Sequence, residues 1–194
     1  GGTFSSDSYR FSGGLHAVGA SVVNALSEWM EVVVNRDGLS HHIRFERGET
    51  VTPLTVTGET DKTGTITTFK PDPEIFSETE VDFALMITRY REMAFLNREA
   101  AFTLIDERET PAVVKKLHYS GGIISFVEYL NRNKAVLNKE PIYFSGEQDG
   151  VFVEVAIQYN DSYNENVYSY ANNIATIEGG SHLTGFRSAL TKTV

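Results

Sequence analysis

Residues 12–19 read Ser12-Gly13-Gly14-Leu15-His16-Ala17-Val18-Gly19, a glycine-rich run that leads directly into an apolar periodic segment. Over residues 15–26 the apolar side chains recur at intervals of three and four, which is the spacing of one helix face. The pattern therefore predicts a tight turn followed by a helix. Such a turn presents unpaired backbone N–H groups beside the positive end of the helix dipole, and both favour an anion such as phosphate.

The glycines of this run have different predicted roles. Gly13 and Gly14 let the backbone turn tightly and approach a ligand, because no Cβ stands in the way. Gly19 lies inside the expected helix, where a glycine permits close packing. A glycine-rich turn is common in proteins that bind no phosphate, so the pattern alone leaves a purely structural turn as an alternative.

The rest of the chain alternates between strand-like and helix-like patterns. Arg36-Asp37-Gly38 is typical of a hairpin turn, and a domain boundary is expected near Ser120-Gly121-Gly122, where a new helix begins. The expected fold is a mixed α+β structure. Strands are predicted at residues 30–35, 41–46, 54–56, 63–69, 101–105, 142–145, 151–159 and 166–170, and helices at 81–97, after 122 and after 182.

Composition limits the classes of function. The net charge of −9 argues against a protein that coats nucleic acid by electrostatics alone. The acidity lies in residues 1–110, with 10 basic and 18 acidic side chains, whereas residues 111–194 carry 7 and 8. The second part can therefore approach DNA more easily. No apolar run is long enough for a membrane span, so we expect a cytoplasmic protein with no membrane partner.

Several specific motifs accompany the glycine run. Together they resemble the ATP lid and following regions of the B subunits of bacterial type IIA DNA topoisomerases, DNA gyrase and topoisomerase IV, members of the GHKL ATPase superfamily. The resemblance covers essentially the whole chain. Its residues are 1–4, 9–26, Thr57-Gly58-Glu59-Thr60, Thr63-Gly64-Thr65, Arg91-Glu92-Met93-Ala94-Phe95-Leu96-Asn97, 121–123, 126–131, Asn172-Asn173-Ile174 and Glu178-Gly179-Gly180-Ser181-His182.

The resemblance implies a domain organisation and a function. Residues 1–120 would be the later part of a GHKL (Bergerat) α/β sandwich ATPase domain. Residues 121–194 would begin a transducer domain of ribosomal protein S5 domain 2-like fold. The chain is then expected to be an internal fragment of an ATP-dependent enzyme that passes one DNA duplex through a break in another. Implied ligands and partners are ATP, Mg²⁺, double-stranded DNA, the topoisomerase A subunit in a heterotetramer, and a second copy of the ATPase subunit on ATP-dependent dimerisation.

The resemblance also implies roles for individual residues. Tyr9 would hydrogen-bond toward ribose or phosphate, and Thr65 would read the adenine edge with a water molecule. Arg187 and Lys192, on the last predicted helix, are candidates for lining a DNA cavity, although solvated helix charges are the plainer interpretation. The triphosphate would be held by the turn at Gly13 and by the backbone of Gly14, Leu15, His16, Ala17, Val18 and Gly19.

Two positions depart from the usual pattern of the family. Thr3 stands where a Lys is common, and loss of such a charge-assisted contact costs about 1.5 to 3 kcal/mol unless Arg10 replaces it. Ala17 replaces a frequent Gly, and its methyl group costs roughly 1 to 2 kcal/mol if the backbone is left-handed there. Relative to the family pattern, these two departures would either reduce nucleotide affinity or only rearrange the contacts.

No catalytic residue and no metal ligand is assigned within the chain. In the resembled family the water-activating Glu and the Mg²⁺-holding Asn precede the lid, so we expect the isolated chain not to hydrolyse ATP. Two alternatives remain open: a non-topoisomerase GHKL clamp of the chaperone or mismatch-repair kind, and a binding domain without nucleotide. The motifs do not separate gyrase from topoisomerase IV.

Overall fold

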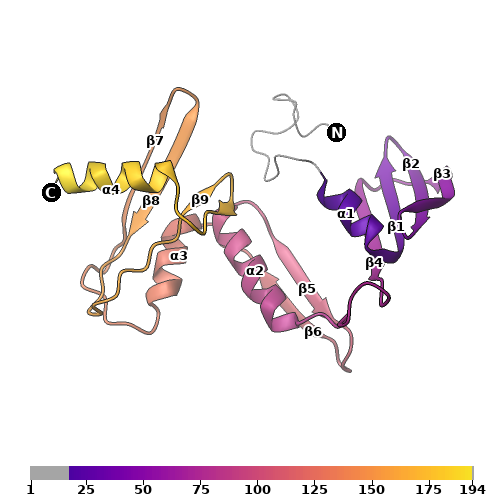
Figure 1. Cartoon of the computed structure of the whole chain (residues 1–194), viewed down its shortest axis with the longest axis horizontal. Helices are drawn as coiled ribbons and strands as arrows, with labels where there is room; N and C mark the ends of the chain where they lie inside the picture. Colours follow the sequence, from indigo (N-terminus) through magenta and orange to yellow (C-terminus); the bar gives the residue numbers. More distant parts are fainter. Residues whose placement is uncertain (1–17, 194) are drawn as a thin grey trace. The chain divides into compact units, whose positions relative to one another are not determined.

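The chain forms two compact units, Gly1–Val81 and Asp82–Val194. The computed structural model describes residues 18–193 (Figure 1). In those residues no helix is long and apolar enough to cross a membrane. The described part of the first unit has a sheet and one helix, the second has hairpins and several helices, and each is described separately below.

The first unit is an antiparallel sheet with one short helix. Its strand order is β3-β2-β1-β4, so the last strand returns to pair with the first. Tight hairpins connect β1 to β2 and β2 to β3, and both turns have residues with positive φ, Asp37-Gly38 and Arg47-Gly48, as two-residue hairpins require. The elements are α1 (Gly19–Ala25), β1 (Ser27–Arg36), β2 (Leu39–Glu46), β3 (Glu49–Glu59) and β4 (Gly64–Pro71).

The two edges of this sheet differ in regularity. The β2–β3 pairing shifts register at three places between Ser40 and Phe45, and β3 also contains Pro53. The β1–β4 pairing runs without a shift from Trp29↔Lys70 to Asn35↔Gly64. One face of the sheet is apolar at its centre, where Met30 on β1 is 5% exposed and lies between Phe45 and Phe69 on the neighbouring strands.

The second unit contains three helices, two longer hairpins and one short hairpin. Its core joins α2 to α3 through aromatic rings: Phe95 is 1% exposed, and its ring centroid lies 3.8 Å from that of Tyr119 and 5.0 Å from that of Phe126. The elements are α2 (Phe83–Leu96), β5 (Phe102–Asp106), β6 (Val113–Leu117), α3 (Gly122–Asn131), β7 (Ile142–Gln148), β8 (Val151–Ile157), β9 (Tyr170–Ala171), β10 (Ile174–Ala175) and α4 (Ser181–Thr193).

Most predicted elements are confirmed, and two differ. The strand predicted at residues 166–170 was wrong except at Tyr170, because the chain there runs as a loop and then makes the two-residue strands β9 and β10. These strands flank Asn172 and Asn173, whose φ angles of 49° and 64° form the turn. Strand β6 was missed because Lys115 and Lys116 interrupt its apolar alternation.

Replacing Phe95 should test the aromatic core of the second unit. Phe95→Ala removes a fully buried ring and leaves a cavity, so the free energy of unfolding should fall by about 3 to 5 kcal/mol. Phe152→Ala is the matched control, because Phe152 lies on β8 and is 48% exposed. Urea denaturation followed by circular dichroism measures both. Equal losses for the two variants would contradict the assignment of Phe95 as the centre of the core.

Candidate nucleotide site

The described residues contain part of the predicted nucleotide site. Val18, Gly19 and Thr65 are described, whereas Tyr9, Gly13, Gly14, Leu15, His16 and Ala17 lie outside the described residues. The three described residues belong to the first unit. Their roles in binding stay predictions, but the geometry around them shows what each can contribute.

Helix α1 begins where the glycine run ends. Val18 is its N-cap residue and makes no side-chain cap hydrogen bond, and its carbonyl accepts from the amide of Val22 at 2.9 Å. The amides of Gly19, Ala20 and Ser21 have no acceptor within α1, because their i−4 carbonyls would precede the helix. The first turn also carries no acidic side chain. The start of α1 is therefore free of a competing carboxylate of its own.

Gly19 was expected to permit close packing. A Cβ built at Gly19 meets no heavy atom of the described residues within 4 Å, and its φ is not in the left-handed region. The described residues therefore give no packing reason for glycine at this position. Its value for a ligand would be the open approach to the backbone.

Thr65 lies on β4, on the face of the sheet that carries the apolar centre. It pairs with Val34, and two residues along the strand Thr67 pairs with Val32 and Phe69 with buried Met30. Because strand residues alternate between faces, Thr65, Thr67 and Phe69 project to the same side. The Thr65 hydroxyl is thus presented about 13 Å along the strand from Phe69, at roughly 3.3 Å a residue.

An apolar groove lies at the Phe69 end of this face. It has a volume of about 290 Å³ and is formed by α1, by the end of β4 and by the segment that follows β4. Its wall is apolar, so it suits a hydrophobic or aromatic group better than a phosphate. The lining includes Val22, Val23, Leu26, Phe69, Pro71 and Phe76.

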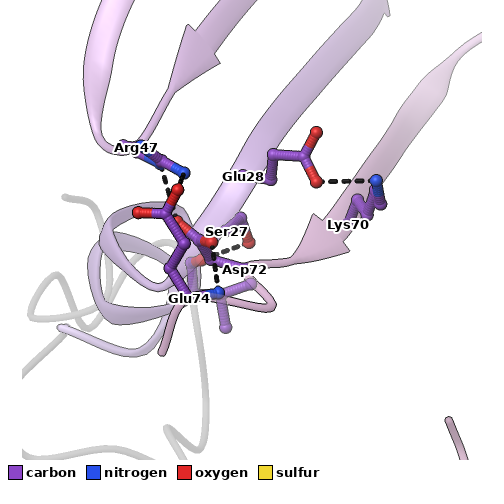
Figure 2. Close-up of polar contacts among 7 residues, drawn as sticks. Ser27, Glu28, Arg47, Lys70, Asp72 and Glu74 are labelled. Carbon is purple, nitrogen blue, oxygen red and sulfur yellow. Dashed lines mark hydrogen bonds and ion pairs between the residues drawn. The ribbon is translucent and has the colours of Figure 1, made fainter. Parts of the chain in front are cut away.

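Asp72, which follows β4, bonds through its side chain to the β2–β3 turn and through its backbone to the end of α1. Asp72 is 1% exposed, and its Oδ2 accepts from Arg47 Nε at 2.8 Å while its Oδ1 accepts from the amide of Glu74 at 2.9 Å. The amide of Asp72 donates to the carbonyl of Leu26, at the end of α1, at 3.1 Å. Figure 2 shows Arg47, Asp72 and Glu74 close together where β4 ends. One residue therefore links the helix, the hairpin turn and the strand.

Further polar contacts support the same corner. The hydroxyl of Ser27, which is 1% exposed, donates to the carbonyl of Val23 at 2.6 Å and so satisfies an acceptor of the last turn of α1 (Figure 2). Lys70 pairs with Glu28 across β1 and β4, Nζ to Oε2 at 2.6 Å. Hydrogen bonds to Glu74 and to Asp72 raise the pKa of the Arg47 guanidinium above its usual value. The corner is held by charge and hydrogen bonds as well as by apolar packing.

The two DNA-cavity candidates lie on α4 in the second unit. Arg187 forms an exposed ion pair with Glu165, Nη2 to Oε1 at 2.8 Å, and Lys192 lies in the last helical turn. A separation of five residues places them about 140° apart around the helix. The structure therefore does not bring them together on one face.

The described residues hold no group of three or more His, Cys, Asp or Glu side chains that could bind a metal ion. His41 and His42 are successive residues of β2 and so project to opposite faces. Asp106 is occupied by Arg108, whose hydrogen bonds lower the pKa of the Asp106 carboxyl to about 2. This carboxylate serves a local turn.

Some residues of the site were not found from sequence. Asp72 was given no role from the sequence, because its partner Arg47 is 25 positions away and nothing local signals the contact. Thr67 and Phe69 were detectable, since period-two alternation from Thr65 places both on its face. The groove itself depends on how α1 lies over the sheet, which the pattern does not specify.

Comparison with known proteins gives consistent matches. The family model DNA gyrase B matches residues 122–194. The DNA gyrase B protein of Bacillus mycoides is 54% identical over 195 aligned residues, covering 100% of this chain and 48% of that protein. The B subunit of the type 2 topoisomerase of Aquifex aeolicus is 52% identical over 194 aligned residues, covering 100% of this chain and 24% of that protein. The chain thus spans about half the length, or less, of these relatives.

Solved structures agree with the sequence matches. The 43K ATPase domain of Thermus thermophilus gyrase B, determined with an aminocoumarin, superimposes with a TM-score of 0.80 and 42% identity, covering 90% of this chain and 48% of that one. The B subunit of Myxococcus xanthus DNA gyrase superimposes with a TM-score of 0.76 and 24% identity, covering 86% of this chain and 49% of that one. The mixed α/β fold is therefore that of gyrase B ATPase-domain structures.

Over its whole length the chain is similar to DNA gyrase B proteins, with identities of 50–55%. Its residues 122–194 also match the DNA gyrase B family model.

Asp72→Asn should weaken the corner that holds α1. The amide lacks the charge that binds Arg47, and loss of a charge-assisted hydrogen bond costs about 1.5 to 3 kcal/mol. The Arg47 side chain is 52% exposed, which places the loss toward the lower figure. Asp37→Asn is the control, because the Asp37 side chain pairs with Arg36 but is 85% exposed. Thermal unfolding should show a clear decrease in Tm for Asp72→Asn only; no decrease would contradict the role given to Asp72.

Proposed function

We propose that this chain is a segment of the ATP-hydrolysing B subunit of a type II DNA topoisomerase, an enzyme that supercoils or decatenates DNA by strand passage. The observation that carries the proposal is the 50–55% identity to DNA gyrase B proteins over the whole chain, together with the match to a gyrase B ATPase domain. The named relatives favour a topoisomerase over the GHKL clamp proteins considered as an alternative.

ATP is the proposed ligand of the first unit. The start of α1, whose first turn carries no acidic side chain, and the sheet face that carries Thr65 fit the two ends of a nucleotide, an anionic end and a hydrogen-bonding base. Val18 and Gly19 would contribute backbone to the phosphates, in continuation of Gly13, Gly14, Leu15, His16 and Ala17, with Tyr9 near the ribose. Mg²⁺ would accompany ATP, with its protein ligand outside this chain.

The proposed boundary between the ATPase part and the transducer part is near residue 120. Two observations support it: α3 begins at Gly122, and the family-model match begins at the same residue. Helix α2 and hairpin β5–β6 belong to the same compact unit as α3, since Phe95 stacks on Phe126. The proposed boundary therefore divides the chain by function, whereas α2 and α3 on its two sides pack together in one compact unit.

The proposed partners follow from the same assignment. They are double-stranded DNA, a topoisomerase A subunit in a heterotetramer, and a second copy of the ATPase subunit that dimerises when ATP binds, in the cytoplasm. Arg187 and Lys192 remain the proposed DNA-cavity residues of α4. In this scheme ATP binding closes a clamp around DNA and hydrolysis resets it.

The proposal is tested in the full-length parent protein with its topoisomerase partner and DNA. Gly14→Val together with Gly19→Val places two branched side chains in the phosphate turn, and displacement of the triphosphate should lower DNA-dependent ATP hydrolysis about 100-fold. Gly146→Val is the control, because Gly146 lies on β7 and a Cβ there meets nothing within 4 Å. ATPase activity that persists in the double variant would refute the phosphate-turn assignment.

Thr65→Val should lower affinity for ATP about two- to tenfold in the same parent protein. The change removes one hydroxyl, worth about 0.5 to 1.5 kcal/mol as a hydrogen bond, while keeping the side-chain shape. Thr68→Val is the matched control, because Thr68 lies on the same strand and projects to the opposite face. Calorimetric titration with ATP and Mg²⁺ measures both. Equal affinities in the two variants would remove Thr65 from the site.

A further inference from the structure

Two arginines of the second unit are held against one tyrosine ring. The guanidinium carbon of Arg132 lies 4.0 Å from the ring centroid of Tyr129, and that of Arg91 lies 5.2 Å from it. Arg91 Nη1 also donates to the Tyr129 hydroxyl at 3.0 Å, and Arg132 Nη1 donates to the Tyr129 carbonyl at 2.7 Å. Two positive charges from α2 and from the end of α3 therefore lie against the same ring.

These arginines differ from most others in the chain. Arg91, Arg132 and the neighbouring Arg89 have no carboxylate within 4.0 Å among residues 18–193. Six arginines do pair with a carboxylate: Arg36, Arg44, Arg47, Arg98, Arg108 and Arg187. Acidic side chains outnumber basic ones in this chain, which has a net charge of −9, so an arginine without a carboxylate partner is unexpected.

Carboxylates stand close in sequence, yet the structure does not use them. Glu128 precedes Arg132 by four residues on α3, the spacing at which a helical ion pair forms, but Arg132 turns back to Tyr129 instead. Glu92 follows Arg91 and accepts a hydrogen bond from the hydroxyl of Tyr170. The two guanidinium groups are thus oriented by an aromatic ring, which orients a cation without neutralising its charge.

We propose that Arg91 and Arg132 form a phosphate-binding subsite for the backbone of double-stranded DNA. A guanidinium has five N–H donors, and each of these two uses one on Tyr129, so most donors remain for an anion. The planar fork matches two phosphate oxygens at once. Lys134, two residues beyond Arg132 and also without an ion pair in the described part of the chain, adds positive charge to the same turn.

DNA as the ligand rests on the proposed function, and the proposed residues belong to the second unit, whereas the described residues of the proposed nucleotide site belong to the first. A duplex backbone presents repeated phosphates, and each contact releases counterions, which gives a measurable salt dependence. Arg132 also caps the last turn of α3 through the Tyr129 carbonyl, but that role needs one donor and no second arginine.

The test measures binding of this 194-residue chain to a fluorescein-labelled duplex of about 20 base pairs by fluorescence anisotropy over a series of salt concentrations. The slope of log K against log salt is negative, and its magnitude should decrease by about 0.9 for Arg91→Gln, by about 0.9 for Arg132→Gln, and by about twice that in the double variant. Arg36→Gln is the control: it removes the same charge from an exposed, paired arginine and should leave the slope unchanged.

Arg91→Lys separates charge from packing, because it keeps the charge and loses the planar fork. It should retain the wild-type slope with weaker binding, whereas a merely structural role would predict the same behaviour for Lys and Gln. Near-ultraviolet circular dichroism confirms that Tyr129 and its neighbours stay packed. An unchanged slope in the double variant, no DNA binding by the chain, or binding of a polyglutamate peptide in place of DNA would each overturn the proposal. Failure here leaves the ATP tests unaffected.

Discussion

The buried carboxylate of Asp72 is the contact on which the first unit depends. A carboxylate that is 1% exposed must be compensated, and here a guanidinium and a backbone amide share the task. The guanidinium comes from Arg47 in the β2–β3 turn, and the backbone amide of Asp72 donates to the carbonyl of Leu26 at the end of α1, so one residue ties the helix to the turn. The ligand-facing features of α1 and β4 therefore share a common support.

In the second unit, aromatic rings rather than charged groups hold the elements together. Phe95 on α2 stacks with rings from the segment before α3 and from α3 itself, and Tyr129 extends this cluster toward the surface. A ring at the edge of a core can orient cations on its outer side, which is how a packing cluster also presents Arg91 and Arg132. Stability and surface charge are thus connected through Tyr129.

Sequence patterns predicted the elements far better than the contacts between them. Alternation in β8 and helical periodicity in α2 are local, so the strand predicted at 151–159 and the helix predicted at 81–97 are observed to within two residues at each end, at 151–157 and 83–96. The pairing of Asp72 with Arg47 and of Tyr129 with Arg91 depends on segments 25 and 38 residues apart, and no local pattern encodes it. Thr65 was placed by family resemblance, whereas its cross-strand partner Val34 required the register of β1 and β4.

The unequal edges of the first sheet have a consequence for association. At β3, Pro53 and three register shifts disturb the row of backbone donors and acceptors, and such irregularities discourage edge-to-edge pairing. Strand β4 is regular, rich in β-branched side chains, and carries a single charge at Lys70. Its outer edge has no partner strand among the described residues. Any added strand, including one from another molecule during aggregation, would therefore extend this sheet at β4 and not at β3.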